Sequence, residues 1–590
     1  MASLTARLSD LFGDAFEANE IDRSFGTVVV SQRPELAQFQ CNGALAAAKT
    51  AGRQPRELAE SVVASLATGG VISSTEIAGP GFININVTDG FLADALQRMS
   101  DDQHLGASRA ARATHPTIVD YGGPNISKAL HVGHLRPAII GEAVKRILSF
   151  AGHDAIGDVH LGDWGTPNGQ VITLLARRHP DWPYFDPDGA GPYPEALPLT
   201  LADLEELYPE AAALHKTDSQ FAAEARRATA ELQDGRPGYL ALWQHLRDIS
   251  VADMAEIYDD LNVSFELWHG ESRVHDRIAP MLDRLRVAGV LTESDGALIV
   301  DVAEPNDTRE IPPLLLVKSD GAYLYSTTDL ATVEERVDDL HAGAVLYVVD
   351  ARQSLHFEQV FRAARLGGIA PQNVVLEHDA FGTVNGPGGK PLRTRDGELP
   401  GLRELVGSAV HRAKDRLLEN DLATEYPPDE REAIAKMVGI AALKYGDLQN
   451  HRTSDYVFDL DRFVSFEGKT GPYLLYSAVR IQSILRNADE RGLNPGPMLA
   501  PGHAAERDLI LSLVRFPDII DRAVEFRAPN HIAEYAYDLA TDFNRFYEAC
   551  HILNEPDAAR QASWLGLVAL TLRTQQTLLD LLAIGVPERM

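Results

Sequence analysis

The sequence predicts an α/β, multidomain protein whose centre is a Rossmann-like, doubly wound parallel-sheet domain. From residue 117 to about 400, short apolar strands alternate with helical segments, which is the pattern of a parallel sheet covered by helices. A small N-terminal α/β module precedes this region, and a C-terminal α-helical bundle follows it, because strand patterns nearly disappear after residue 402. A chain of 590 residues is also too long for a single hydrophobic core.

Residues 1–100 form the predicted N-terminal module. Its clearest strand is 82–87, in which apolar residues alternate with polar ones. We expect Asp89 to cap the helix that follows, because an aspartate there accepts hydrogen bonds from free backbone N–H groups. The polar segment 101–116 is expected to be a linker.

The central domain is predicted for residues 117–400. Its apolar runs 344–349 and 373–376 indicate buried strands, and the periodic segments 330–340 and 357–366 indicate helices between them. Ligands of such a domain bind at the carboxyl ends of its strands.

Two further regions complete the predicted organisation. The proline-rich stretch 180–198 interrupts the alternating pattern and indicates an inserted subdomain near 166–240. Residues 401–470 are expected to form a helical connecting segment, and residues 471–590 a helical domain.

Composition excludes several classes of protein. No apolar run is long enough to span a membrane, and the N-terminus lacks the apolar core of a signal peptide. The only cysteines, Cys41 and Cys550, are too few for a thiolate zinc site or a disulfide framework. We therefore expect a cytoplasmic protein without a metal site of its own.

The net charge of −31 argues against non-specific binding to nucleic acid. A local basic face can nevertheless bind phosphates, and Arg480, Arg486 and Arg491 form one candidate in a helical segment. By charge alone these arginines also fit a solvated helix face.

The most informative segment is His131-Val132-Gly133-His134. An apolar strand, 117–121, leads into a glycine-bearing turn, and a helix begins near the two histidines. Such a turn directs backbone N–H groups and a helix dipole toward a phosphate, and imidazoles one turn apart can both reach it. Gly133 would let a nucleotide approach the backbone closely. In isolation the motif would also fit a surface helix with two chance histidines.

The longer segment 123–136 resembles the first ATP-binding motif of class I aminoacyl-tRNA synthetases, and among them that of the arginyl-tRNA synthetases. The resemblance continues, in the family's order, in residues 160–166, 318–330, 389–395, 444–447 and 542–548. Each piece alone is weak, but the ordered set covers nearly the whole chain.

The resemblance implies an arginine–tRNA ligase, in which ATP, L-arginine and tRNA(Arg) give arginyl-tRNA, AMP and diphosphate through an arginyl-adenylate. It implies attack by the terminal 2′-hydroxyl of the tRNA, and a need for bound tRNA before arginine is activated. Mg²⁺ should accompany ATP without a dedicated protein site. We expect a monomer whose partners are these substrates.

On the phosphate side, the resemblance assigns His131, His134 and Gly133 to ATP binding. The two histidines would stabilise the charge that develops on the phosphate during the reaction.

The second class I signature is a mobile basic loop that holds the pyrophosphate. Here the glycine-rich segment 381–397 carries Lys390 and Arg393, and Arg393 stands where the family has a lysine. Arginine binds phosphates with a different geometry, and Lys128, just before the first motif, matches the family's compensating lysine. Without the upstream motif the loop would fit a flexible surface hairpin.

Recognition of arginine requires carboxylates that face a planar guanidinium. The resemblance assigns this role to Asp120 and Asp329, with Tyr325 packed on the guanidinium plane. Asn125 and Gln353 would hold the α-amino and carboxylate groups. Taken singly, Asp329 could be a helix cap and Asn125 a turn residue.

Residues 471–480 resemble the start of the family's anticodon-binding domain, although Leu475 replaces glutamine and 477–479 replace Ala-His-Ala. The aromatic residues of this region, Tyr473, Tyr476, Phe543, Phe546 and Tyr547, could stack on unpaired anticodon bases, but we expect about half of them to be core residues instead. The candidate tRNA-binding residues are Tyr473, Tyr476, Arg480, Asn544 and Tyr547. The resemblance also implies that the N-terminal module contacts the tRNA elbow at its D-loop.

Two other interpretations remain open from the sequence. A small nucleotidyltransferase shares the histidine motif, although the long helical C-terminus and the Tyr325–Asp329 pair argue against it. A duplicated paralogue could bind tRNA or arginine without full ligase activity. His131, His134 and Lys128 argue against that interpretation.

Overall fold

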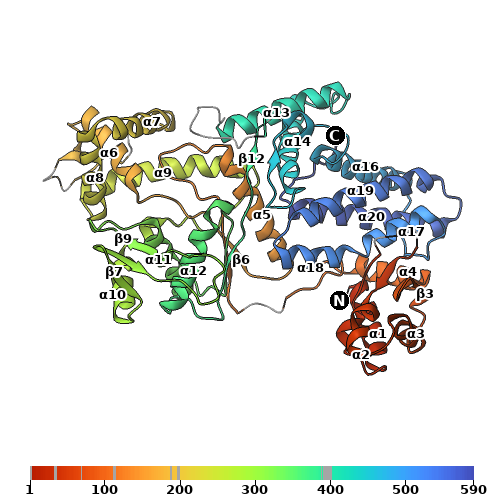
Figure 1. Ribbon diagram of the computed structural model, residues 1–590. Helices are drawn as coiled ribbons and strands as arrows, with labels where there is room; N and C mark the ends of the chain where they lie inside the picture. The colour runs from red at the N-terminus through yellow and green to blue at the C-terminus, as the bar shows by residue number, and fades with distance from the viewer. Residues whose placement is uncertain are drawn as a thin grey trace. The chain divides into compact units, whose positions relative to one another are not determined.

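A computed structural model provides the structure of the protein. It describes residues 3–31, 33, 36–67, 69–110, 114–186, 189, 191–195, 199–386, 388–389 and 401–590. The chain divides into two compact units. Unit 1 comprises Met1–Ala110, Ser465–Leu581 and Val586–Met590, and unit 2 comprises Ala111–Val464 and Leu582–Gly585. Figure 1 shows the elements of both units by label and colour.

Unit 2 contains a four-stranded sheet with the order β11-β10-β5-β6, and all neighbouring strands are parallel. Its strands are β5 (Thr117–Asp120), β6 (Ala155–Asp158), β10 (Ala344–Tyr347) and β11 (Val375–His378). The chain runs outward from β5 to β6 and then returns to the other side of β5. The strand order therefore reverses between β5 and β10, and a ligand crevice forms at such a reversal, beyond the carboxyl ends of the strands.

The helices that connect these strands bury one apolar face on the core. They are α5 (Leu135–Phe150), α10 (His275–Val287), α11 (Tyr325–Asp338) and α12 (Ser354–Leu366). Leu330 and Val333 lie three residues apart on one face of α11 and pack with Ile118, Val345 and Ala363 in a fully buried cluster. The core thus fixes the position of α11 relative to the ends of β5 and β10.

The predicted strand limits differ from the observed ones by a few residues. β10 ends at Tyr347 rather than at 349, and β11 begins at Val375, two residues later than expected. Both strands are short because they pair only over four registered residues each.

The inserted subdomain has its own core. Its helices are α6 (Thr166–Arg178), η3 (Pro183–Phe185), α7 (Leu201–Thr217), α8 (Ser219–Gln233) and α9 (Pro237–Asp260). Phe221 and Leu242 are fully buried in a cluster to which Trp164 also belongs. Part of the proline-rich stretch lies outside the described residues.

Several smaller elements complete unit 2. They are η4 (Glu271–Val274), β7 (Leu291–Ser294), β8 (Ala297–Val300), β9 (Leu314–Val317), η5 (Ala351–Gln353), β12 (Val384–Asn385), α13 (Leu402–Glu419), α14 (Pro428–Leu448), β13 (Tyr456–Val457) and α15 (Leu460–Phe463). β7, β8 and β9 form an antiparallel sheet, and β12 pairs with β13.

Unit 1 begins with an antiparallel sheet of order β1-β2-β4-β3. Its elements are α1 (Leu4–Glu17), η1 (Arg23–Gly26), β1 (Val28–Val30), β2 (Phe39–Cys41), α2 (Gly43–Ala51), α3 (Pro55–Ala64), β3 (Ile72–Ala78), β4 (Phe82–Val87) and α4 (Asp89–Asp101). The predicted strand 82–87 is confirmed. The predicted cap is wrong: Thr88 is the N-cap of α4, and its hydroxyl accepts from Phe91 N–H. Asp89 pairs instead with Arg507.

The helical part of unit 1 packs with this module. Its elements are α16 (Gly471–Glu490), α17 (Ala504–Leu513), α18 (Phe516–Phe526), α19 (Asn530–Ala549), η7 (Ile552–Asn554) and α20 (Ala558–Leu581). Thr5 donates to Asp518, and Arg573 donates to the backbone carbonyls of Met99 and Asp102. The first and last parts of the chain therefore share one compact unit, although the sequence suggests separate domains.

Within the described part of the chain, every helix is too short or too polar to span a bilayer.

Candidate active site

The two motif histidines are held by backbone hydrogen bonds. His131 is the N-cap of η2 (Val132–His134), which continues into α5. Gly133 N–H donates to His131 Nδ1 at 3.1 Å, and His131 N–H donates to His134 Nδ1 at 3.1 Å. The ring centroids lie 4.0 Å apart. Because Nδ1 accepts in both rings, the proton of each neutral imidazole lies on Nε2, which can donate to a ligand.

Both histidines are neutral at pH 7. Burial, with a contribution from the Lys128 ammonium, lowers the pKa of His131 to about 4. Burial, His131 and Lys128 lower the pKa of His134 to about 3. The pair therefore offers two oriented N–H donors without a positive charge of its own.

Gly133 is required by the histidine pair itself. A Cβ at this position would lie 2.8 Å from His131 Cε1 and 2.9 Å from His131 Nδ1. Any larger residue would push the His131 ring out of its hydrogen bond with the backbone. The expected close approach of a nucleotide to Gly133 stays a prediction.

The cations near the motif have distinct surroundings. Lys128 lies with its ammonium 5.9 Å from the centre of the Tyr208 ring. Arg136, in the first turn of α5, is buried, pairs with Asp447 at 3.3 Å and donates to the carbonyl of Gly382. It thus fixes the start of the predicted signature loop. Two predicted phosphate-binding residues of that loop, Lys390 and Arg393, lie outside the described residues.

A buried arginine bridges two carboxylates at the end of the sheet. Asp120 ends β5 and Asp158 ends β6, and Arg336 of α11 donates through Nη2 to both, at 2.7 Å each. The guanidinium also lies 5.2 Å from the centre of the Tyr347 ring. Arg336 is fully buried, so its charge is compensated within the protein.

The two carboxylates respond differently to this environment. Burial raises the pKa of Asp120, and Arg336 opposes that shift only in part. Burial also disfavours ionised Asp158, but Arg336 and His160 outweigh it and keep the pKa of Asp158 below its ordinary value. Asp120 therefore already has a guanidinium partner, which the sequence does not indicate. Its predicted contact with substrate arginine would have to be shared with Arg336.

Asp329 forms a second acidic position near the sheet end. His356 of α12 contacts it through Nε2 at 2.6 Å, and the Tyr325 ring lies 4.7 Å from the His356 ring. The Tyr325 side chain is 60% exposed. Asp329 does not cap a helix, because α11 has Leu324 as its N-cap. The structure thus brings Tyr325 and Asp329 together on one turn of α11, as the sequence predicts.

The two predicted amide residues lie in loops after strands of the same sheet. Asn125 follows β5 and forms a parallel bridge with Gly162. A Cβ on Gly162 would lie 2.0 Å from Asn125 Oδ1, so glycine is needed there. Gln353 is exposed at the end of η5, which follows β10. Their predicted contacts with the α-amino and carboxylate groups stay untested.

Four residues near this edge were missed by the sequence analysis: His160, Glu271, Arg336 and His356. His160 has a left-handed backbone (φ 42°), and its Nδ1 is buried without a hydrogen-bond partner among the described residues. Burial raises the pKa of Glu271, and Asp329 adds to that shift. His160 opens the segment 160–166 that resembles a family motif, so the sequence pointed to the family there but gave no role for His160.

The predicted tRNA-binding residues lie on α16 and α19. Asn544 donates to the Tyr473 hydroxyl at 3.0 Å, and the Arg480 guanidinium lies 4.6 Å from the centre of the Tyr547 ring. Tyr476 is 40% exposed. Phe543 and Phe546 are fully buried and are therefore core residues.

The patch suggested by Arg480, Arg486 and Arg491 is only partly available. Arg486 donates to the carbonyl of Glu588 and to the Ser483 hydroxyl. Arg480 is the member of this series that stacks on an aromatic ring.

Comparisons with known proteins agree with the geometry over the whole chain. Residues 97–460 match the family described as tRNA synthetases class I (R), catalytic domain. The chain belongs to the arginyl-tRNA synthetases. Residues 2–87 match the arginyl tRNA synthetase N terminal domain, and residues 474–590 match the DALR anticodon binding domain. The predicted family and fold class are confirmed.

Individual relatives of this synthetase cover its full length. It is 47% identical to the arginine–tRNA ligase of Alkaliphilus oremlandii and 46% identical to that of Maricaulis maris, with 100% of each chain covered. The crystal structure of arginyl-tRNA synthetase from Plasmodium falciparum has a TM-score of 0.83 at 25% identity, with 100% of both chains covered.

Proposed function

We propose that the protein is an arginine–tRNA ligase, which uses ATP to join L-arginine to tRNA(Arg). The supporting observation is the combination of a neutral histidine pair and an acidic set on one sheet edge, in a chain related to arginine–tRNA ligases over its full length. The histidine pair can donate hydrogen bonds to a triphosphate, and the acidic residues can accept hydrogen bonds from a guanidinium.

In the first step, the carboxylate of arginine attacks the α-phosphorus of ATP, and the bond to pyrophosphate breaks. Negative charge shifts onto phosphate oxygens as this happens. The Nε2–H groups of His131 and His134 would donate to those oxygens without first losing a proton, because both rings are neutral. In the second step, the terminal 2′-hydroxyl of tRNA attacks the carbonyl of the adenylate and releases AMP.

On the amino-acid side, Asp329 would accept hydrogen bonds from the substrate guanidinium. His356 contacts Asp329 Oδ2 and so holds the carboxylate in place. The exposed ring of Tyr325 would pack on the guanidinium plane. Asp120 would contribute its charge while Arg336 holds one of its oxygens. Asn125 and Gln353 would contact the α-amino and carboxylate groups.

The pyrophosphate would be shared between Lys128 and the loop residues Lys390 and Arg393. Mg²⁺ would enter with the phosphates of ATP, because it keeps several waters and binds through phosphate oxygens. Lys128→Ala and Arg393→Ala should be non-additive in kcat if they share this load. Strict additivity of the two changes would contradict a shared role.

The tRNA would be bound by two parts of unit 1. Tyr473, Tyr476, Arg480, Asn544 and Tyr547 would meet the anticodon region, since tyrosine rings can stack on unpaired bases. The N-terminal module would contact the tRNA elbow at its D-loop. Footprinting of bound tRNA(Arg) should show protection at both places. Protection confined to the anticodon stem would contradict the contact between the N-terminal module and the tRNA elbow.

The decisive experiment is exchange of pyrophosphate into ATP. We expect exchange that depends on both L-arginine and tRNA(Arg). A nucleotidyltransferase would exchange without arginine, and a binding paralogue would not exchange at all. We further propose that the protein acts as a monomer in the cytoplasm, which light scattering after gel filtration would test for the monomer.

A further inference from the structure

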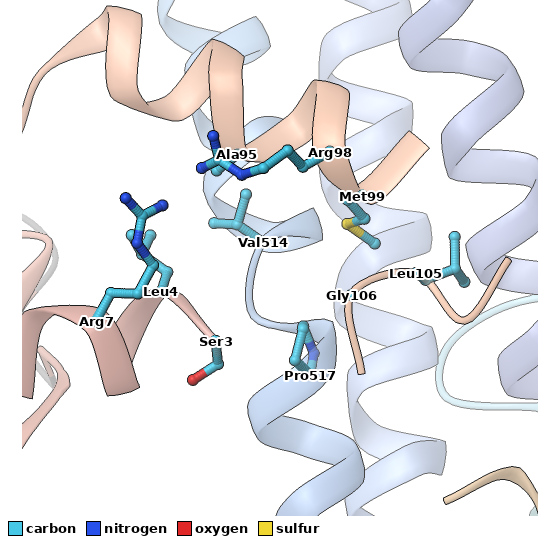
Figure 2. Close-up of a pocket in the computed structure, with 10 residues that line it drawn as sticks. All are labelled: Ser3, Leu4, Arg7, Ala95, Arg98, Met99, Leu105, Gly106, Val514 and Pro517. Carbon is cyan, nitrogen blue, oxygen red and sulfur yellow. The ribbon is translucent and has the colours of Figure 1, made fainter. Parts of the chain in front are cut away.

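A separate pocket lies in unit 1, among α1, α4 and the start of α18. Its volume is about 480 Å³, within the range of small-molecule sites. Figure 2 shows its lining residues as sticks. No residue assigned above to ATP, arginine or tRNA lines this pocket.

Two arginines from different helices reach this pocket. Arg7 lies in α1 and Arg98 in α4, and both side chains are partly buried. Figure 2 shows their guanidinium groups on the same side of the pocket. Burial lowers the pKa of Arg7, and the Arg98 charge lowers it further, because the two cations repel each other.

Neither arginine has a carboxylate within ion-pair distance among the described residues. Arg7 lies over the Phe91 ring, 4.5 Å from its centre, and only Asp94 acts on it electrostatically from farther away. Asp518, beside the pocket, is bound to the Thr5 hydroxyl instead. By contrast, Arg23 of the same module pairs with carboxylates of α1. In the described part of the chain, two cations thus lie at this place without a direct carboxylate partner.

Apart from Ser3, the rest of the pocket lining is apolar. Leu4, Met99, Leu105, Val514 and Pro517 contribute aliphatic atoms, and all five residues are buried. Figure 2 shows Met99, Leu105 and Pro517 on the side away from the guanidinium groups. A ligand that fits would therefore carry a charged head at one end and an apolar body at the other.

We propose that this pocket binds a small phosphate monoester with an apolar body, its phosphate between Arg7 and Arg98. A dianionic phosphate can accept from two guanidinium forks at once, whereas one carboxylate is satisfied by one fork. The body would lie against Met99, Val514 and Leu105. Because α1, α4 and α18 all contribute, the bound ligand would tie the N-terminal module to the helical part of unit 1. This inference does not depend on the proposed ligase activity.

The test is calorimetric titration of the full-length protein with hexyl phosphate, in the presence of saturating ATP to fill the nucleotide site. We expect saturable binding at least tenfold tighter than that of inorganic phosphate. Arg98→Gln should weaken the binding of hexyl phosphate at least tenfold. Arg53→Gln, at an exposed arginine of the same module, should leave it unchanged.

A second pair of variants tests the apolar end and guards against misfolding. Val514→Thr keeps the side-chain shape and should weaken hexyl phosphate while leaving inorganic phosphate unchanged. Arg98→Lys keeps the charge and should give an intermediate affinity. In the two Arg98 variants the melting temperature and the kcat of aminoacylation should match those of the wild type. Val514→Thr places a hydroxyl at a nearly buried position, so it should lower the melting temperature while kcat stays the same.

Three results would overturn the proposal. Equal affinities for hexyl phosphate and inorganic phosphate would show that the apolar end of the pocket does not contribute to binding. An unchanged affinity in Arg98→Gln would place the bound phosphate elsewhere. Displacement of hexyl phosphate by tRNA(Arg), with a tenfold rise in the KM for tRNA in Arg98→Gln, would identify these arginines as contacts of the RNA backbone instead.

Discussion

The histidine pair and the acidic set lie on one sheet edge but handle charge in opposite ways. His131 and His134 are kept neutral, because burial and Lys128 lower the pKa of both rings. Asp120 and Asp158 share an internal counter-ion, the fully buried Arg336. The histidine pair presents uncharged N–H donors to a ligand. Asp120 and Asp158 instead present carboxylates that already pair with Arg336.

This difference shows how a site can bind a polyanion and a cation side by side. Neutral donors need no counter-ion when the site is empty, so the histidines can stay buried at little electrostatic cost. Buried carboxylates need a partner at all times, and Arg336 provides it before substrate arrives. We expect loss of the Arg336 bridge to affect folding, and loss of a motif histidine to affect chemistry.

The largest effect should follow Arg336→Met. Two adjacent buried carboxylates would lose their partner, which should reduce the free energy of unfolding by about 3–5 kcal/mol. The pKa values of Asp120 and Asp158 would then rise in the folded state, so this loss should shrink as the pH falls from 8 to 5. Arg336→Lys should reduce the free energy of unfolding by less than Arg336→Met, because it keeps a positive charge beside the carboxylates. Urea unfolding at both pH values measures this, and a change below about 1 kcal/mol at pH 8 would contradict the bridging role.

His134→Ala should change chemistry and spare folding. We expect kcat for arginine activation to fall by about 10²–10³, because one oriented donor to the developing charge is lost. The KM for arginine should change little. His134→Asn keeps an acceptor for His131 N–H and should preserve the loop without restoring the rate. Pyrophosphate exchange measures both variants, and an unchanged kcat would disprove the assigned role.

Asp329→Asn should lower kcat/KM for arginine by about 10–100-fold, since a charge-assisted contact with the guanidinium becomes a neutral one. Discrimination against citrulline, which has a similar shape without the charge, should shrink. The KM for ATP should stay the same. Asp339→Asn, at the other end of α11 and paired with Arg277, is the matched control. If the ratio of arginine to citrulline keeps its wild-type value, Asp329 does not read the guanidinium.

The smallest effect concerns pH. Because the folded pKa values of His131 and His134 are about 4 and 3, neither ring titrates between pH 5.5 and 8. Titration of these two rings should therefore change the rate of activation by less than about twofold over that range. The profile should show no inflection near the ordinary histidine pKa of about 6.5. A pH–rate profile measures this. An inflection near 6.5 that disappears in His134→Asn would mean that the imidazole works as a cation.

The sequence predicted much of this architecture because its signals are local. The strand 82–87 alternates apolar and polar residues, and the motif around His131 joins a strand, a glycine turn and a helix. Tyr325 and Asp329 lie one turn apart on a helix, so their proximity follows from helical spacing.

What could not be predicted depends on contacts between distant segments. Arg336 stands next to two glutamates in the sequence, and nothing local shows that it alone reaches Asp120, 216 residues away. Asp89 seemed a suitable cap, but Thr88 precedes it and takes that role, which frees Asp89 for Arg507. Local patterns give elements and motifs, whereas counter-ions and unit boundaries come from tertiary structure.

The make-up of unit 1 has a consequence for synthesis of the chain. Gln97 accepts from Met498 N–H across 401 residues, so the first module reaches its final neighbours only after most of the chain has been made. At roughly 5–20 residues per second, translation separates these two partners by about 20–80 s. During that interval the surfaces of α1 and α4 that later meet α17, α18 and α20 remain uncovered on the ribosome. These surfaces are therefore exposed to chaperones and to aggregation in the nascent chain, and slower translation would lengthen that exposure.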